Sequence, residues 1–319
     1  MKQFPLLPLI RAVQDMADQR GEPEYDWPSV DFVVGRGRLR MLLKWVRGLQ
    51  PDEWRIDTQL AGRNTIILSG CAVPTNQDNQ DGRQGESYGF NIEREATDPV
   101  LPTELGNETG HYRIVTYVRA LCSGFERIDP KRYQDFDGLK MVVSFEVDAC
   151  YHKPTPAAAA STSPSDNPAI GTTVTEEGPP SAPPSNSPKI KIIRGGFVVD
   201  QSQLLEIKTQ SSPPPDWAKA YPQLYLSQIP RVYYVFHEDG EPHRSMQFKL
   251  NALVHEEKRA RDGFKKLRKL LGDIKLLVLK HGTMKISLVC KGKKLSVHQR
   301  PDSESCLPKD ELALFGSAA

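Results

Sequence analysis

The stretch MVVSFEVDA at residues 141–149 breaks a hydrophobic run with two acidic residues, Glu146 and Asp148. Val, Met and Phe in such a run favour a half-buried β-strand, and side chains alternate between the two faces of a strand. We therefore expect the two carboxylates on one face of the strand, with Phe145 and Val147 packed on the other.

A second stretch, LLEIKT at residues 204–209, has the same pattern, with Glu206 and Lys208 two positions apart. If the two strands are neighbours, three carboxylates and one ammonium group meet on one surface. Carboxylates share a desolvated place only when a cation neutralises them, and their hard oxygen atoms suit Mg²⁺ or Mn²⁺. The alternative is that all four charges lie on the solvent face of half-exposed strands. The arrangement ExD…ExK is characteristic of PD-(D/E)XK nucleases, which favours the metal site.

The two stretches are separated by residues 153–188, which contain nine prolines and no aromatic residue. Such a segment cannot bury enough apolar surface to offset its ordering entropy, so disorder is predicted. A disordered loop between adjacent strands costs little, because closure entropy grows only logarithmically with length. We therefore expect one domain over residues 1–300 with an insertion at 153–188, rather than two domains joined by a linker. Residues 301–319 are expected to form a C-terminal tail.

In the remaining segments, the spacing of hydrophobic residues is in turn that of a helix and that of a strand. This alternation predicts an α/β (α+β) fold of mixed β-sheets flanked by helices. Helices are expected at 36–48, 88–96, 216–228 and 255–273. Strands are expected on either side of the insertion, at 139–152 and 189–209, and at 111–122 and 274–299. Two strands joined by a Gly-containing turn are expected at 54–73, and a hairpin about the DGEP turn at 231–237 and 243–253. Pro222 lies in the third of these helices, so that helix either starts near Tyr221 or is kinked.

The composition excludes several classes of protein. The chain has 42 Lys and Arg against 40 Asp and Glu, which gives a net charge of +2. This balance excludes a polybasic nucleic-acid tail and an acidic chaperone. No apolar run approaches the roughly 20 residues that span a bilayer, so no membrane association is expected. The N-terminal stretch MKQFPLLPLIRAV is a poor signal peptide. The five cysteines contain no CxxC pair, which excludes a disulfide scaffold or zinc ribbon and favours a reducing compartment.

Several motifs, taken in order along the chain, resemble those of the DXO family of decapping and RNA 5′-end-processing exoribonucleases. They are DFVVGRGRLRMLL (31–43), WRIDTQLAGRNTIIL (54–68), GFNIE (89–93), YRIVTYVRAL (112–121), EVDAC (146–150), EIKT (206–209) and QLYLSQIP (223–230). The sequence departs from the family pattern at Gly35, where a tryptophan is usual, at Pro222, and in the length of the insertion at 153–188.

The resemblance implies a sheet-centred nuclease fold whose pocket holds Mg²⁺ or Mn²⁺, as two ions. It implies that Glu93, Asp148 and Glu206 bind the metal together with the backbone carbonyl of Ile207. Glu146 would bind the metal directly or through water and would take part in catalysis.

The resemblance also implies the residues that handle the substrate. Lys208 and Gln223 would position the attacking water and the scissile phosphate, and Arg36 would bind a phosphate of the RNA 5′ end. Four more cations on the same predicted helix, Arg38, Arg40, Lys44 and Arg47, lie near Arg36 and would follow an RNA backbone if RNA enters there.

The implied activity is metal-dependent hydrolysis at RNA 5′ ends in mRNA quality control. It comprises removal of defective or NAD caps, release of pyrophosphate from 5′-triphosphate RNA, and 5′→3′ digestion. The implied location is the nucleus, with the cytoplasm as the alternative, and the implied protein partner is a larger 5′→3′ exoribonuclease. Two other functions remain open: a non-catalytic partner of such an exoribonuclease, and a DNA nuclease of the wider PD-(D/E)XK superfamily.

Overall fold

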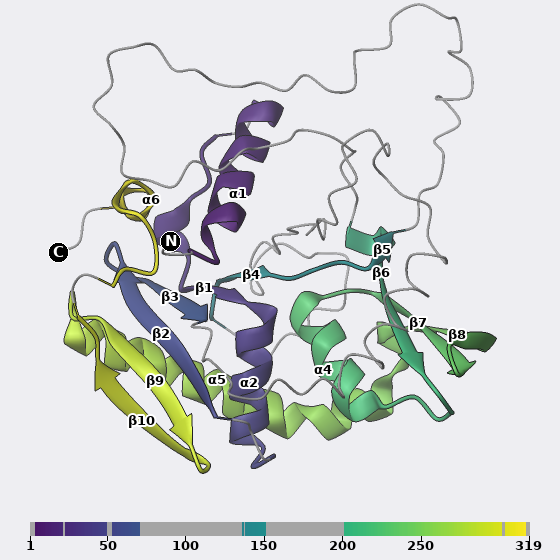
Figure 1. The fold of residues 1–319 in the computed structure, drawn as a ribbon. Coiled ribbons are helices and arrows are strands. Elements are labelled where there is room, and N and C mark those ends of the chain that lie inside the picture. The colour runs from purple at the N-terminus through teal and green to yellow at the C-terminus, as the bar shows by residue number, and fades with distance from the viewer. Residues whose placement is uncertain are drawn as a thin grey trace, which may run out of the picture.

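The structure is a computed structural model of the chain, and it describes residues 4–21, 23–49, 53–70, 136, 138–150, 201–301 and 304–316. The strands of these residues form two mixed sheets with helices packed against them (Figure 1). This confirms the predicted α/β class. None of the helices in these ranges has the length and hydrophobicity that crossing a bilayer requires.

The first sheet has six strands in the order β10-β9-β2-β3-β1-β4. Its strands are β1 (Phe32–Gly35), β2 (Trp54–Ala61), β3 (Thr65–Gly70), β4 (Met141–Ser144), β9 (Ile286–Lys291) and β10 (Lys294–Gln299). β1 runs parallel to β3 and β4, and the other neighbours are antiparallel. The hairpin predicted at 54–73 is confirmed over its described residues, and Gly62 in its turn has the positive φ of 59° that favours glycine.

The second sheet has four strands in the order β5-β6-β7-β8. Its strands are β5 (Ala149–Cys150), β6 (Leu204–Gln210), β7 (Arg231–Glu238) and β8 (Glu241–Lys249). The predicted hairpin about the DGEP turn is confirmed. Asp239 and Gly240 have φ values of 49° and 93°, as a two-residue type I′ turn requires, and the twist of such a turn matches that of the strands it joins.

The strands on either side of the proline-rich segment are neighbours, as expected, since Ala149 pairs with Leu205 and Cys150 with Leu204. The strand predicted at 139–152 is shorter, because residues 145–148 leave the ladder between β4 and β5. The insertion at 153–188 and the elements predicted at 88–96 and 111–122 lie outside the described residues. The division into one domain with an insertion stays a prediction.

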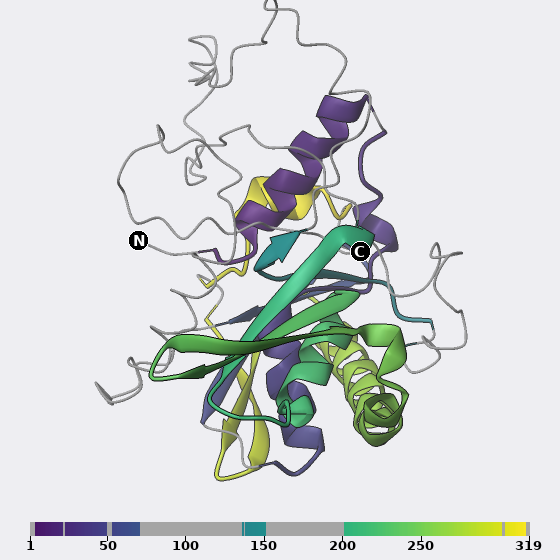
Figure 2. The ribbon, with the colours of Figure 1, turned by 90° about the vertical axis from the view of Figure 1, so that its right-hand side faces the viewer.

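The helices are α1 (Leu7–Arg20), α2 (Arg36–Val46), α4 (Trp217–Ser227), α5 (Val254–His281) and α6 (Lys309–Ala313). Short 3₁₀ turns lie at Trp27–Ser29, Gln201–Gln203 and Leu250–Ala252. Alternate residues of β1 divide the core, because Phe32 and Val34 belong to one hydrophobic cluster and Val33 to another. α2, α4 and α5 contribute to the first cluster and α1 to the second, so the helices cover opposite faces of the six-stranded sheet (Figure 2).

The prediction of a strand at 274–280 is wrong, because α5 continues through these residues to His281. The apolar run IKLLVLK fits a strand when read alone. In the helix, however, Ile274 and Val278 extend the buried stripe of Leu267 and Leu271 at intervals of three and four residues. Burial of this stripe in the first hydrophobic cluster therefore decides the structure of the run.

The described part of 301–319 is not a free tail, which corrects that prediction. Leu307 and Phe315 are buried in the second hydrophobic cluster beside α1, a helix that the sequence reading had not recognised. The Arg11 side chain on α1 donates two hydrogen bonds to Glu311 on α6, at 2.8 and 2.5 Å. The backbone of Phe315 also covers Gly62 so closely that a Cβ atom there would lie 1.9 Å from the Phe315 carbonyl oxygen.

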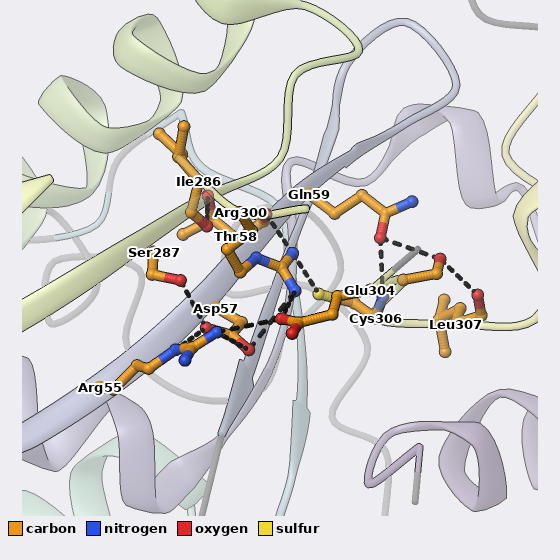
Figure 3. Close-up of polar contacts among 11 residues, drawn as sticks. Arg55, Asp57, Thr58, Gln59, Ile286, Ser287, Arg300, Glu304, Cys306 and Leu307 are labelled. Carbon is orange, nitrogen blue, oxygen red and sulfur yellow. Dashed lines mark hydrogen bonds and ion pairs between the residues drawn. The ribbon is translucent and has the colours of Figure 1, made fainter. Parts of the chain in front are cut away.

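A buried polar network fixes the start of this C-terminal segment on β2 (Figure 3). Arg300, only 5% exposed, donates to the Thr58 carbonyl at 2.9 Å and lies 3.4 Å from Asp57 Oδ2. It also donates to Cys306 Sγ at 3.4 Å, while the Cys306 N–H donates to Gln59 Oε1 at 2.7 Å. Burial raises the pKa of the Cys306 thiol to about 11. These contacts are structural, and they lie on the α1 side of the sheet.

Candidate active site

Glu206 on β6 is the most deeply buried charged residue of the candidate site, with a side chain that is 0% exposed. Its carboxylate is contacted by two cationic side chains and one side-chain amide. Arg36 Nη1 lies 3.1 Å from Oε2, Lys208 Nζ lies 2.5 Å from Oε1, and Gln223 Nε2 donates to Oε1. An unpaired charge at this depth would be strongly unfavourable, so these three partners are what allow a carboxylate here.

Three oxygen atoms surround the ammonium group of Lys208. Glu206 Oε1 lies at 2.5 Å, the Ile207 carbonyl at 3.1 Å and Asp148 Oδ2 at 3.6 Å. All three were expected from the sequence to bind metal. The structure therefore brings these donors to one point and shows that the point accommodates a positive charge.

Asp148 is held in place by the strand that carries the other donors. Although it lies in the segment between β4 and β5, its Oδ2 accepts a hydrogen bond from the Ile207 N–H at 2.8 Å. Burial, followed by the nearby charge of Glu206, raises the pKa of Asp148 to about 6, against the opposing influence of Lys208 and the Ile207 N–H. A cation between the two carboxylates would favour their ionised forms.

Gln223 reaches Glu206 from α4, although Pro222 lies inside that helix. α4 begins at Trp217, where the Asp216 side chain accepts a hydrogen bond from the Lys219 N–H at 3.3 Å. Of the two alternatives that the sequence left open, a start near Tyr221 is therefore wrong. Pro222 removes one N–H from the helix interior without moving Gln223 away from the site.

Ser227 is a member of the site that the sequence reading missed. Its hydroxyl donates to the Gln223 carbonyl at 2.6 Å and accepts from Arg36 Nη1 at 3.3 Å, so it joins α4 to the start of α2. Arg36 also lies over the ring of Phe145, with its Cζ 5.5 Å from the ring centroid. The spacing of four residues from Gln223 was a signal for Ser227, since it places both on one face of a helix.

Not every predicted ligand is brought to this point. Glu146 is exposed, whereas its neighbours Phe145 and Val147 are buried, as the alternation of side chains predicts. Glu93 lies outside the described residues. Within the described ranges, no group of three or more His, Cys, Asp or Glu side chains forms a metal-binding cluster. The two carboxylates and one carbonyl around Lys208 are nevertheless the hard oxygen donors that Mg²⁺ and Mn²⁺ prefer, so the residues present fit such an ion.

A family model described as "Domain of unknown function (DUF8563)" matches residues 1–299. A search of the curated proteins finds no match to the chain.

Solved structures of Rai1 and Dxo1 proteins are similar to the chain over most of its length. Rai1 of Candida albicans in complex with pU5-Mn²⁺ is 12% identical, with 99% of this chain and 80% of that chain covered and a TM-score of 0.57. S. pombe Rai1 in complex with 3′-FADP is 15% identical, with 92% of this chain and 77% of that chain covered and a TM-score of 0.54. K. lactis Dxo1 in complex with manganese is 9% identical, with 94% of this chain and 72% of that chain covered and a TM-score of 0.50. The expected similarity to the DXO family is therefore confirmed for the fold.

Proposed function

We propose that this chain is a divalent-metal-dependent hydrolase of RNA 5′ ends. It belongs to the DUF8563 family and has the fold of Rai1 and Dxo1. Its reactions are removal of defective or non-canonical caps and release of pyrophosphate from 5′-triphosphate RNA, with 5′→3′ digestion as a further activity. The observation that carries the proposal is the convergence of Asp148, Glu206 and the Ile207 carbonyl on one cationic position. The proposed setting is mRNA 5′-end quality control in the nucleus.

The proposed metal ligands are Asp148, Glu206 and the Ile207 carbonyl, completed by Glu93 and Glu146. Mg²⁺ or Mn²⁺, as two ions, would neutralise the carboxylates, bind the scissile phosphate and lower the pKa of the attacking water. That C. albicans Rai1 and K. lactis Dxo1 were crystallised with manganese supports this choice of ion.

The side chains around these ligands have separate proposed roles. Lys208, with three donor hydrogens, orients the attacking water and the scissile phosphate. Gln223 holds the carboxylate of Glu206 in position and contacts the same water. Arg36 neutralises the buried charge of Glu206 and, with its remaining donors, contacts a phosphate of the RNA.

One assay tests the proposal. The purified chain is given Mn²⁺ and RNAs that end in a 5′-triphosphate, a cap, an NAD cap or a monophosphate, together with duplex DNA. We expect hydrolysis of at least one RNA 5′ end, loss of that activity in EDTA and in Asp148→Asn, and no cleavage of the DNA. The control Lys219→Met alters an exposed cation that pairs with Asp216, away from the proposed ligands, and should keep the activity.

The same assay separates the two alternatives. Cleavage of duplex DNA regardless of the RNA 5′ group would favour a DNA nuclease. Failure to hydrolyse any substrate, combined with stimulation of a larger 5′→3′ exoribonuclease by the chain, would favour a non-catalytic partner. Either result would contradict the proposed hydrolase.

A further inference from the structure

Arg36, the arginine that the sequence assigns to a phosphate, is already engaged by the protein. Its side chain is 12% exposed, and its Nη1 contacts both Glu206 Oε2 and Ser227 Oγ. The guanidinium also lies over the ring of Phe145. The Arg36 guanidinium therefore already serves to neutralise Glu206.

Arg40 stands one helical turn after Arg36, and it is in a different situation. Residues four apart on a helix share a face, and both side chains are half-buried. No hydrogen bond or ion pair joins the Arg40 guanidinium to any other residue in the described part of the chain. The charges of Arg36 and Glu206 both act on Arg40. Burial, followed by the charge of Arg36, lowers the pKa of Arg40.

The other cations of α2, and Arg47 directly after it, are directed elsewhere. Arg38 contacts Met41 Sδ at 3.1 Å and lies over Gly70 of β3, where its Nη2 would be 1.9 Å from an added Cβ atom. Arg47 packs on Gly263 of α5, and Lys44 is exposed. Of the five basic residues at 36–47, Arg40 therefore combines proximity to Glu206 with a guanidinium that no described residue binds.

The two guanidinium groups near Glu206 favour an anion. The charge of Glu206 acts on both Arg36 and Arg40, while Lys208 lies beside its other oxygen atom, 3.6 Å from Asp148. One carboxylate does not compensate two guanidinium groups in a half-buried place. Phosphate matches the forked donors of arginine, which can bind two of its oxygen atoms at once.

We propose that Arg40 binds the terminal phosphate group of an RNA 5′ end, an assignment that rests on the proposed function. In this arrangement Arg36 compensates Glu206, and Arg40 distinguishes a 5′-phosphorylated end from a 5′-hydroxyl end. Arg40 is then a specificity-determining residue of the site.

The test compares two labelled RNAs of the same sequence, one with a 5′-phosphate and one with a 5′-hydroxyl. Affinities are measured by fluorescence anisotropy in EDTA and in Ca²⁺, with the RNA checked for cleavage afterwards. The readout is the ratio of the two dissociation constants, which a loss of folded protein does not change. We expect the wild type to prefer the 5′-phosphate and Arg40→Gln to lose about tenfold or more of that preference. Binding of the 5′-hydroxyl RNA should stay unchanged.

Two further variants complete the experiment. Arg40→Lys keeps the charge and should retain part of the preference, while Arg38→Gln, a matched arginine on another face of α2, should retain all of it. A wild-type preference that survives in Arg40→Gln would overturn this inference and leave the proposed function standing. A wild type that binds both RNAs equally would overturn the recognition of 5′ ends and this inference with it.

Discussion

Lys208 Nζ lies 2.5 Å from Glu206 Oε1, on the side of the carboxylate that faces Asp148 and the Ile207 carbonyl. The two residues are two positions apart on β6, so the strand supplies a buried anion together with its counter-ion. Because the same three oxygens are the proposed ligands of a divalent ion, the ammonium group and the ion compete for one position.

The first prediction follows from this competition. Lys208→Met removes the competing cation and keeps the oxygen donors, so we expect Mn²⁺ to bind about tenfold more tightly, the equivalent of one charged hydrogen bond. Isothermal titration calorimetry at constant pH measures the affinity. Lys219→Met, which removes an exposed ammonium group, is the matched control and should bind Mn²⁺ like the wild type. Weaker binding by Lys208→Met would show that the lysine does not occupy the position of the metal.

The two central carboxylates should differ in what their removal does to stability. Glu206→Gln leaves the largely buried Arg36 without its counter-charge and should lower the free energy of unfolding by about 3–5 kcal/mol. Asp148→Asn keeps an oxygen that can accept from the Ile207 N–H, and the raised pKa of Asp148 shows that its charge is already unfavourable. We expect that change to cost about 1 kcal/mol or less. Urea unfolding measures both, and equal losses would contradict this account.

The C-terminal segment should contribute stability without contributing chemistry. Phe315 is 2% exposed in the cluster beside α1, so Phe315→Ala should cost about 3–5 kcal/mol of unfolding free energy. Lys309→Ala, an exposed change in the same segment, should cost little. Turnover per folded molecule should be the same in both variants and the wild type. A selective loss of turnover in Phe315→Ala would mean that the segment reaches the site.

Cys306 should make stability fall at alkaline pH. Its pKa is raised from 9.0 to about 11 by burial, so the folded protein holds the thiol proton more tightly than the unfolded chain. This contribution is fully present below pH 9 and is lost as the pH rises toward 11. Between pH 8 and pH 10 the wild type should lose about 1.3 kcal/mol more than Cys306→Ala. Parallel curves for the two proteins in urea unfolding would contradict the raised pKa.

The sequence predicted the centre of the site because alternation along a strand is a local property. Glu206 and Lys208 lie on β6, and Phe145 and Val147 are buried beside Asp148, as their spacing implied. The adjacency of β5 and β6 followed from the low cost of closing the long insertion. Position 93 was also assigned from its motif, but it lies outside the described residues, and that assignment stays a prediction.

Other features depend on contacts between distant segments, which no local pattern encodes. The run IKLLVLK satisfies two periodicities, and only the burial of Ile274 and Val278 in the first hydrophobic cluster decides for the helix. The sequence around Phe315 is that of a tail when taken alone, and its burial depends on contacts with α1 and Gly62. The difference between Arg36 and Arg40 likewise depends on which of them reaches Glu206.

The pairing of Arg11 with Glu311 joins positions that are 300 residues apart in the chain. During synthesis, the ribosome therefore releases α1 long before residues 304–316, which cover part of its apolar side, exist. Leu9 and Ile10, which are buried in the finished protein, lack the cover of Leu307 and Phe315 through most of translation. This nascent chain should accordingly be a client of chaperones that hold exposed hydrophobic helices until synthesis reaches residues 304–316.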